Sequence, residues 1–203
     1  MRWAPTPVRR LLLLAMVLLP RLASADGRLL DDDAFAVTSS GNLALDAGLL
    51  VATPAALPSG LSTGIAAGIT RNCGCHFSYG ARASWSTVTE GSQFWTVSHD
   101  DIRLRAVGAV RHTVGRGSVG LRLGLGTTIV HETRTRTQGM GAGRTDLDTT
   151  AWAALPALDL EALFAVHVTG AWVANISAGP SFDRADGALR TGWVMGLGVA
   201  WEP

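Results

Sequence analysis

One stretch of the sequence, residues 119–132, constrains the fold of this chain more than any other. It reads VGLRLGLGTTIVHE, and every second residue from Val119 to Ile129 is large and mostly apolar, whereas the residues between them are small or polar. Alternation with a period of two predicts a β-strand that has one apolar face and one polar face. Strands of soluble domains most often have about five or six residues. A strand of about ten residues or more with a single apolar face is typical of a membrane-spanning barrel.

The same alternation recurs along the rest of the chain. The predicted strands span residues 42–52, 61–71, 76–88, 102–113, 119–132, 151–161, 167–179 and 190–201. Pro156 lacks the N–H group that a strand ladder uses, so we expect a bulge or a break in the sixth strand. The sequence therefore predicts an all-β domain, an eight-stranded antiparallel up-and-down transmembrane β-barrel in residues 42–203.

The N-terminal segment indicates the compartment. Arg2, Arg9 and Arg10 precede an apolar run, Leu11 to Leu19, and Ala23-Ser24-Ala25 forms a small-residue cleavage site. This arrangement predicts a secretory signal peptide, residues 1–25, that is removed from the mature protein. Residues 26–41 would then form a polar N-terminal segment in the periplasm, ahead of the barrel.

The charge balance excludes nucleic acid as an expected partner. The chain contains 17 basic residues, all arginine, and 16 acidic residues. Removal of residues 1–25 would leave 13 arginines against 16 acids, a net charge of −3. No basic patch is dense enough to predict a nucleic-acid site.

The predicted connections alternate in length. The first, third, fifth and seventh are long, and the second, fourth and sixth are short, the last of these at residues 162–166. Outer-membrane barrels have short turns on the periplasmic side and longer loops outside. Aromatic residues also gather near the predicted strand ends, as in the aromatic girdles of such barrels.

The chain resembles the small eight-stranded outer-membrane β-barrel proteins of Gram-negative bacteria. The resemblance rests on the signal peptide, the alternation, the unequal loop lengths and the C-terminal strand that ends at Trp201. The resemblance covers roughly residues 42–201 and implies a porin-like location in the cell outer membrane. It implies outer-membrane lipid, lipopolysaccharide and the barrel-assembly machinery as partners, with no cofactor. We expect a structural or surface-interaction role, with the long extracellular loops as the contact surface for an unidentified ligand.

Charged residues concentrate on the inward face of the predicted barrel, where they would form a lumen charge network. Its members are Asp46, Arg82, Arg103, Arg105, Arg111, Arg122, Glu132, Asp159 and Glu161. The interior of an eight-stranded barrel is just wide enough for side chains to fill it. Buried charges must pair, because an unpaired ion costs several kcal/mol, by the order of magnitude of its desolvation. We expect a closed, salt-bridged lumen, and the alternative is a narrow arginine-lined conduit for anions.

His76-Phe77-Ser78 is similar to the His-x-Ser pair of the outer-membrane lipid A deacylases, which are also small barrels. In such a pair histidine acts as the base and serine as the nucleophile. Tyr79 stands where that motif has asparagine, and the pair lies beside a short turn. An enzyme with His76 and Ser78 as catalytic residues is thus an alternative to the non-enzymatic role. A second alternative is a soluble secreted β-barrel, in which the apolar faces would point inward.

Three further features concern cysteines, exposed arginines and metal ligands. Cys73 and Cys75 would tend to form a local disulfide in an oxidising periplasm. Arg134, Arg136 and Arg144 lie in a polar segment and could contact lipopolysaccharide phosphates. The histidines and acids at residues 99–101 and 131–132 could ligate a metal ion, but spacing alone is weak evidence and solvated loop residues are the commoner case, so no metal site is expected.

Overall fold

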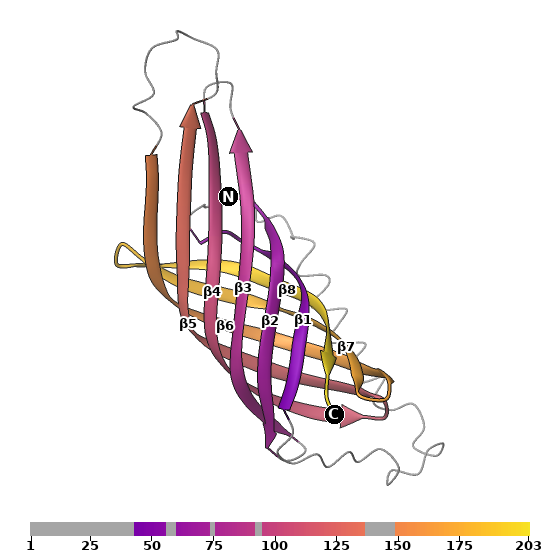
Figure 1. The fold of residues 1–203 in the computed structure, drawn as a ribbon. Coiled ribbons are helices and arrows are strands. Elements are labelled where there is room, and N and C mark those ends of the chain that lie inside the picture. Colours follow the sequence, from indigo (N-terminus) through magenta and orange to yellow (C-terminus); the bar gives the residue numbers. More distant parts are fainter. Residues whose placement is uncertain (1–42, 56–59, 74–75, 92–94, 137–148) are drawn as a thin grey trace, which may run out of the picture. The chain divides into compact units, whose positions relative to one another are not determined.

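A computed structural model describes residues 43–55, 60–73, 76–91, 95–136 and 149–203, and these residues form one closed barrel of eight strands (Figure 1). The strands are β1 (Leu43–Ala52), β2 (Ser62–Cys73), β3 (Phe77–Gly91), β4 (Trp95–Val114), β5 (Gly117–Arg136), β6 (Thr149–Thr169), β7 (Trp172–Ala185) and β8 (Ala188–Trp201). Each strand pairs with the next in antiparallel order, and the predicted fold class is confirmed.

Pairing between the first and last strands closes the ring. β1 and β8 run antiparallel from Leu45 opposite Trp201 to Ala52 opposite Val194. Closure gives both edge strands a neighbour, so their backbone N–H and C=O groups are satisfied without water. Within the described residues, no helix is long and apolar enough to cross a membrane.

The two faces of the strands divide the side chains as the alternation predicts. Large apolar residues point outward, and Leu121, for example, is 60% exposed. Inward positions hold small apolar residues together with polar and charged ones, and Arg103 is only 2% exposed. A soluble barrel would need the opposite assignment, because its apolar side chains must be removed from water.

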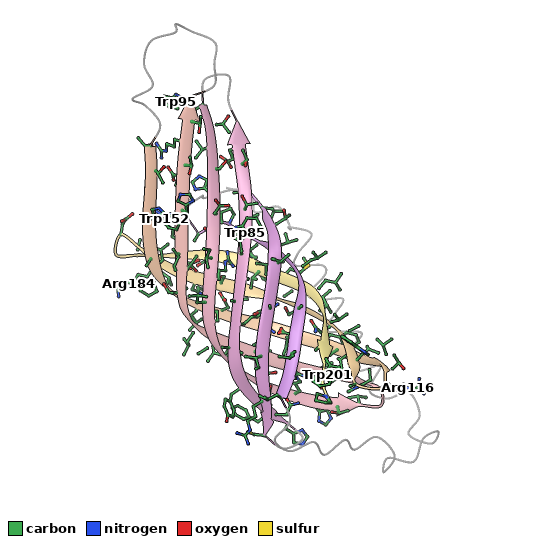
Figure 2. The ribbon with its side chains drawn as sticks, viewed as in Figure 1. Trp85, Trp95, Arg116, Trp152, Arg184 and Trp201 are labelled. Atoms are coloured by element: carbon green, nitrogen blue, oxygen red, sulfur yellow. The ribbon has the colours of Figure 1, made fainter. Side chains whose placement is uncertain are left out.

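The two ends of the barrel differ. The turn end carries the connections at residues 74–76, 115–116 and 170–171 and the C-terminus, whereas the loop end carries those at residues 53–61, 92–94, 137–148 and 186–187. Figure 2 shows Trp85 and Trp152 toward the loop end and Trp201 near the turn end, with Trp95 farther out. Aromatic side chains therefore lie toward both ends.

The sixth and seventh connections differ from the prediction. β6 continues through the predicted turn to Thr169, and the chain reverses at Gly170, whose φ of +51° suits glycine. In place of the long seventh connection predicted between residues 179 and 190, the structure has a two-residue turn, Asp186-Gly187, with φ values of +52° and +78°. Two positive φ values define the tight hairpin turn for which Asp-Gly is a preferred sequence. The seventh connection is therefore short.

The third connection is also shorter than predicted, because β3 extends to Gly91 and β4 begins at Trp95. Pro156 does not break β6; it lies opposite Thr127 of β5, and the pairing of β6 with β7 begins only at Ala157. Pro156 thus occupies an edge position, where a proline nitrogen is tolerated.

The Asp186-Gly187 turn yields a prediction about stability. Gly187→Val places a branched side chain at positive φ, so we expect the free energy of unfolding to fall by about 1–2 kcal/mol. Gly91→Val is the matched control, because Gly91 lies at a strand end where an added Cβ would meet no heavy atom of the described residues within 4 Å. Equilibrium unfolding in urea measures both variants, and equal losses would contradict this account of the turn.

Candidate functional site

The barrel has two features that bear on function, the charged lumen and the strands that extend beyond the ring at the loop end. The charged lumen begins at the loop end. There Asp101 Oδ2 accepts a hydrogen bond of 2.9 Å from Ala55 N and lies 3.7 Å from Arg103 Nη2. Arg103 Nη2 donates to Thr53 O at 2.8 Å. These buried groups attach the segment after β1 to β4.

The middle of the lumen is held by one arginine. Arg105 Nε donates to Asp159 Oδ2 at 2.7 Å, and Nη2 of the same guanidinium donates to Thr128 Oγ1 at 2.9 Å. Ser181 Oγ donates to Asp159 Oδ1 at 2.6 Å, and Thr128 Oγ1 donates to Asp183 Oδ1 at 2.7 Å. Both oxygens of Asp159 are therefore occupied, and the cluster links β4, β5, β6 and β7.

A second cluster lies one step toward the turn end. Arg122 and Glu161 are direct cross-strand partners, and the guanidinium donates to both carboxylate oxygens, at 3.1 Å and 2.6 Å. Such a bidentate pair is among the stronger ion pairs in proteins. Arg82 Nη1 approaches the same carboxylate at 3.8 Å from β3. A side chain at Gly196 would crowd this guanidinium, since its Cβ would lie 3.3 Å from Arg82 Nη2.

The turn end of the lumen is less filled. Arg111 Nη1 donates to Glu202 Oε1 at 2.7 Å. A small cavity of about 40 Å³ is lined by Asp46, Ser78, Arg111 and Glu202, among others. The lower lumen thus has walls of mixed polar and apolar side chains and a little free volume beneath the Arg122–Glu161 pair.

The structure places eight of the nine residues of the predicted lumen charge network along the lumen. Arg105 and Asp159 belong to the first cluster, and Arg82, Arg122 and Glu161 belong to the second. Arg103 contacts Asp101, and Asp46 and Arg111 line the lower cavity. The ninth, Glu132, lies at the loop end, where its carboxylate pairs with Arg134 and lies 3.5 Å from Nδ1 of the buried His99. The predicted network lacks Asp101, Asp183 and Glu202, because these residues lie outside the predicted strands at residues 102–113, 167–179 and 190–201. Asp101 shares the inward parity of Arg103 and Arg105, a signal that could have placed it.

The structure describes three of the four residues of the His-x-Ser pair and the cysteine pair, namely Cys73, His76 and Ser78. His76 Nδ1 lies 3.1 Å from Arg111 O, and Ser78 Oγ is buried without a hydrogen-bond partner among the described residues. His76 and Ser78 are therefore not hydrogen-bonded to each other. Cys73 is exposed at the end of β2, and Cys75 lies outside the described residues, so the disulfide between them stays a prediction.

Two further predictions concern arginines and metal ions. Arg134 is exposed and paired with Glu132. The side chain of Arg136 and the whole of Arg144 lie outside the part that the structure describes. Within the described ranges, no group of three or more His, Cys, Asp or Glu side chains is placed to hold a metal ion.

Four strands continue past the ring at the loop end, and we refer to them as the strand extension. It comprises residues 88–91 of β3, 95–99 of β4, 132–136 of β5 and 149–156 of β6. Pairing of β2 with β3 ends at Thr87, and pairing of β7 with β6 ends at Ala157, so the extension has neither β2 nor β7 as a neighbour. Figure 1 shows β3 to β6 rising beyond the other strands.

The outward face changes character at the row where β3, β4 and β5 enter the strand extension. Residues that lie opposite one another on β3, β4, β5 and β6 form rows across this face. From the turn end toward the loop end, three consecutive rows are Trp85, Ile102, Ile129 and Ala154, then Thr87, Asp100, His131 and Trp152, then Thr89, Ser98, Thr133 and Thr150. In the second row, His131 stacks on Trp152 with ring centroids 4.0 Å apart and lies 3.4 Å from Asp100 Oδ2. The face is apolar below this row and polar above it.

Comparison with known proteins supports the fold. No protein-family model matches the chain, and no curated protein matches it. Two crystal structures of Ail, the attachment invasion locus protein of Yersinia pestis, are similar over 80% of this chain and 99% of theirs. The one in complex with the heparin analogue sucrose octasulfate has a TM-score of 0.54 at 10% identity, and the other has 0.50 at 12%. Neisserial surface protein A has 0.48 at 10% identity, over 79% and 96% of the two chains. In fold, the chain resembles the small eight-stranded outer-membrane β-barrels of Gram-negative bacteria.

The Arg105–Asp159 pair generates a stability prediction. Arg105→Met leaves Asp159 buried without its cation, so we expect the free energy of unfolding to fall by about 3–5 kcal/mol. The double variant Arg105→Met/Asp159→Leu removes both charges and should recover most of that loss. The control is Arg134→Met, whose exposed ion pair should contribute less than about 1 kcal/mol. Urea unfolding in lipid vesicles measures all three, and a double variant as unstable as the single one would contradict the pairing.

Proposed function

We propose that the protein is an outer-membrane β-barrel with its turn end in the periplasm and its loop end outside the cell. The change from apolar to polar rows at the start of the strand extension carries this proposal. On β5 the outward apolar positions run from Val119 to Ile129. That length is roughly 33 Å of strand at about 3.3 Å per residue. A tilt of about 40° reduces it to roughly 25 Å, the height of the apolar band of such barrels.

The proposal includes the processing and the partners expected from the sequence. Residues 1–25 would be removed as a signal peptide, and residues 26–41 would precede the barrel in the periplasm. Outer-membrane lipid and lipopolysaccharide would surround the protein, and the barrel-assembly machinery would insert it. The paired charges of the lumen would close it to solutes, since Arg105, Arg122 and their carboxylate partners occupy its middle.

The biological role that we propose is structural or interactive, with the strand extension as the contact surface. The extension gives a rigid support to the residues at the loop end, because its four strands are hydrogen-bonded to one another. Its outer face presents hydroxyl groups around Trp152, which is 64% exposed. Exposed tryptophan is enriched among the residues that contribute most to binding. The Ail structure with a heparin analogue shows that protein with a polyanionic ligand, and the same contact remains a proposal for this chain.

The membrane location predicts heat-modifiable migration. The protein purified from the outer-membrane fraction should migrate differently on a denaturing gel when boiled and when unboiled. The reason is that a barrel with a closed hydrogen-bonded ring resists detergent until it is heated. Recovery from the soluble periplasm, with identical migration of both samples, would overturn the proposal.

The contact surface predicts that adhesion depends on Trp152. Bacteria that display Trp152→Ala should bind cultured epithelial cells several-fold less than bacteria that display the original protein, because the variant loses the exposed ring. The control is Trp172→Ala, since Trp172 is also half exposed but begins β7 at the turn end. Both variants must first show equal amounts of the heat-modifiable form. Equal adhesion by the two variants would contradict the assignment of the contact surface.

A further inference from the structure

The outer wall of the barrel has a groove that crosses β2, β3, β4 and β5. Its volume is about 820 Å³, and its lining includes Ala67, Ile69, Ala81, Ala83, Leu104 and Ala106. Ligand pockets in proteins commonly have volumes of roughly 300–1,000 Å³. Four of these six outward residues are alanine, whereas most other outward positions of the described strands carry larger side chains. Short side chains between longer ones therefore form the groove.

The groove is closed toward the loop end. Its two rows of outward residues are Ala67, Ala83, Leu104 and Thr127, then Ile69, Ala81, Ala106 and Leu125. The next row toward the loop end consists of Ile65, Trp85, Ile102 and Ile129. All four of these side chains are large, so they form a ridge across the end of the groove.

The groove is open toward the turn end. The next row in that direction is Arg71, Tyr79, Gly108 and Leu123. Gly108 lacks a side chain, and a Cβ added there would meet no heavy atom of the described residues within 4 Å. A gap therefore remains in the wall between Tyr79 and Leu123, and it continues the groove toward the end of the barrel.

A cation lies beside this open end. Arg71 is exposed two residues before the end of β2, and it has no ion pair among the described residues. Its outward cross-strand neighbours, Leu43 and Tyr79, carry no carboxylate. The row beyond them, Cys73, Phe77 and Val110, contains no acid either. Arginine binds phosphate oxygens through two parallel hydrogen bonds, and tyrosine is enriched at the level of lipid headgroups.

We propose that the groove is a binding site for one anionic phospholipid, with an acyl chain along the alanines and the phosphate at Arg71. The inference rests on the proposed membrane location, and it deepens that proposal by naming one lipid and one site. In the proposed orientation the turn end lies in the periplasmic leaflet, whose lipids are phospholipids. A lipid of the opposite leaflet would have to cross the ridge that Trp85 and Ile102 form.

Charge complementarity selects the headgroup. The rows around Arg71 contain no acidic side chain that would receive the ammonium group of a zwitterionic lipid. A headgroup with a net negative charge, such as phosphatidylglycerol, balances the arginine instead. The site therefore discriminates by charge at its open end and by shape along the groove.

Native mass spectrometry tests the headgroup contact. The full mature barrel is released from detergent micelles that contain dioleoyl phosphatidylglycerol and dioleoyl phosphatidylcholine in equal amounts. The main lipid adduct should be one phosphatidylglycerol, and Arg71→Gln should reduce it several-fold. Arg184→Gln is the matched control and should keep the adduct, because Arg184 is an exposed arginine at the loop end of β7. Equal adducts of the two lipids, or equal losses in the two variants, would overturn the proposal.

A second pair of variants tests the groove itself. Ala106→Phe fills the groove with a ring and should also lose the phosphatidylglycerol adduct. Ala178→Phe should keep it, because Ala178 is an exposed outward alanine on β7, away from the groove. An unchanged adduct in Ala106→Phe would show that the acyl chain does not use the groove, and the site would be wrong.

Heat-modifiable migration separates this inference from the proposed location. Variants that all migrate as membrane barrels but bind phosphatidylglycerol like the original protein would contradict the lipid site alone. Recovery of the original protein from the soluble periplasm would contradict both the location and the site.

Discussion

The hydrogen-bonded closure of β1 onto β8 is the constraint on which the other features of this structure depend. In an apolar environment each backbone N–H and C=O must find a partner within the chain, and a closed ring achieves this with strands. Closure with eight strands fixes a narrow lumen that side chains fill. Because strand residues alternate between faces, the outside must then be apolar and the inside must hold everything else. The buried charges of this protein are a consequence of that geometry.

Charges in a narrow lumen are stable only as sets that balance one another. Arg105 reaches across β5 to pair with Asp159 of β6, and Arg122 of β5 pairs with Glu161 of the adjacent β6. The hydroxyls of Ser181, Thr128 and Ser177 occupy further donors and acceptors around these pairs. Polar residues that carry no signal of their own in the sequence therefore complete the clusters. Removal of one residue leaves its partners buried without a hydrogen bond or counter-charge, which lowers the free energy of unfolding.

The sequence was sufficient for the fold class and for the face of each strand, because both follow from a period of two. It was less informative about where strands end. Asp186-Gly187 reverses the chain inside a polar segment that was predicted as a loop, and the signal was a dipeptide whose residues tolerate positive φ. β6 passes through the predicted turn because its alternation continues to Val168, and Gly170 is the residue that permits reversal. Polar residues near an end do not distinguish a loop from a strand that has left the apolar layer.

The same limitation applied to the candidate site. The alternation of strand residues places Arg82, Arg103 and Arg105 on one face. Which carboxylate pairs with which arginine depends on the register between neighbouring strands. That register could not be predicted, because it follows from where the strands actually begin and end. Asp101 and Asp183 lie outside the predicted strands because the strands that carry them run farther than the apolar pattern does. In β3 to β6 the hydrogen-bonded ladder continues while the outward residues change from Ile102 and Ile129 to Asp100 and His131. A strand can therefore extend beyond the apolar layer that it crosses. The row at which the outward residues become polar is then a better structural marker of the membrane surface than the end of the strand.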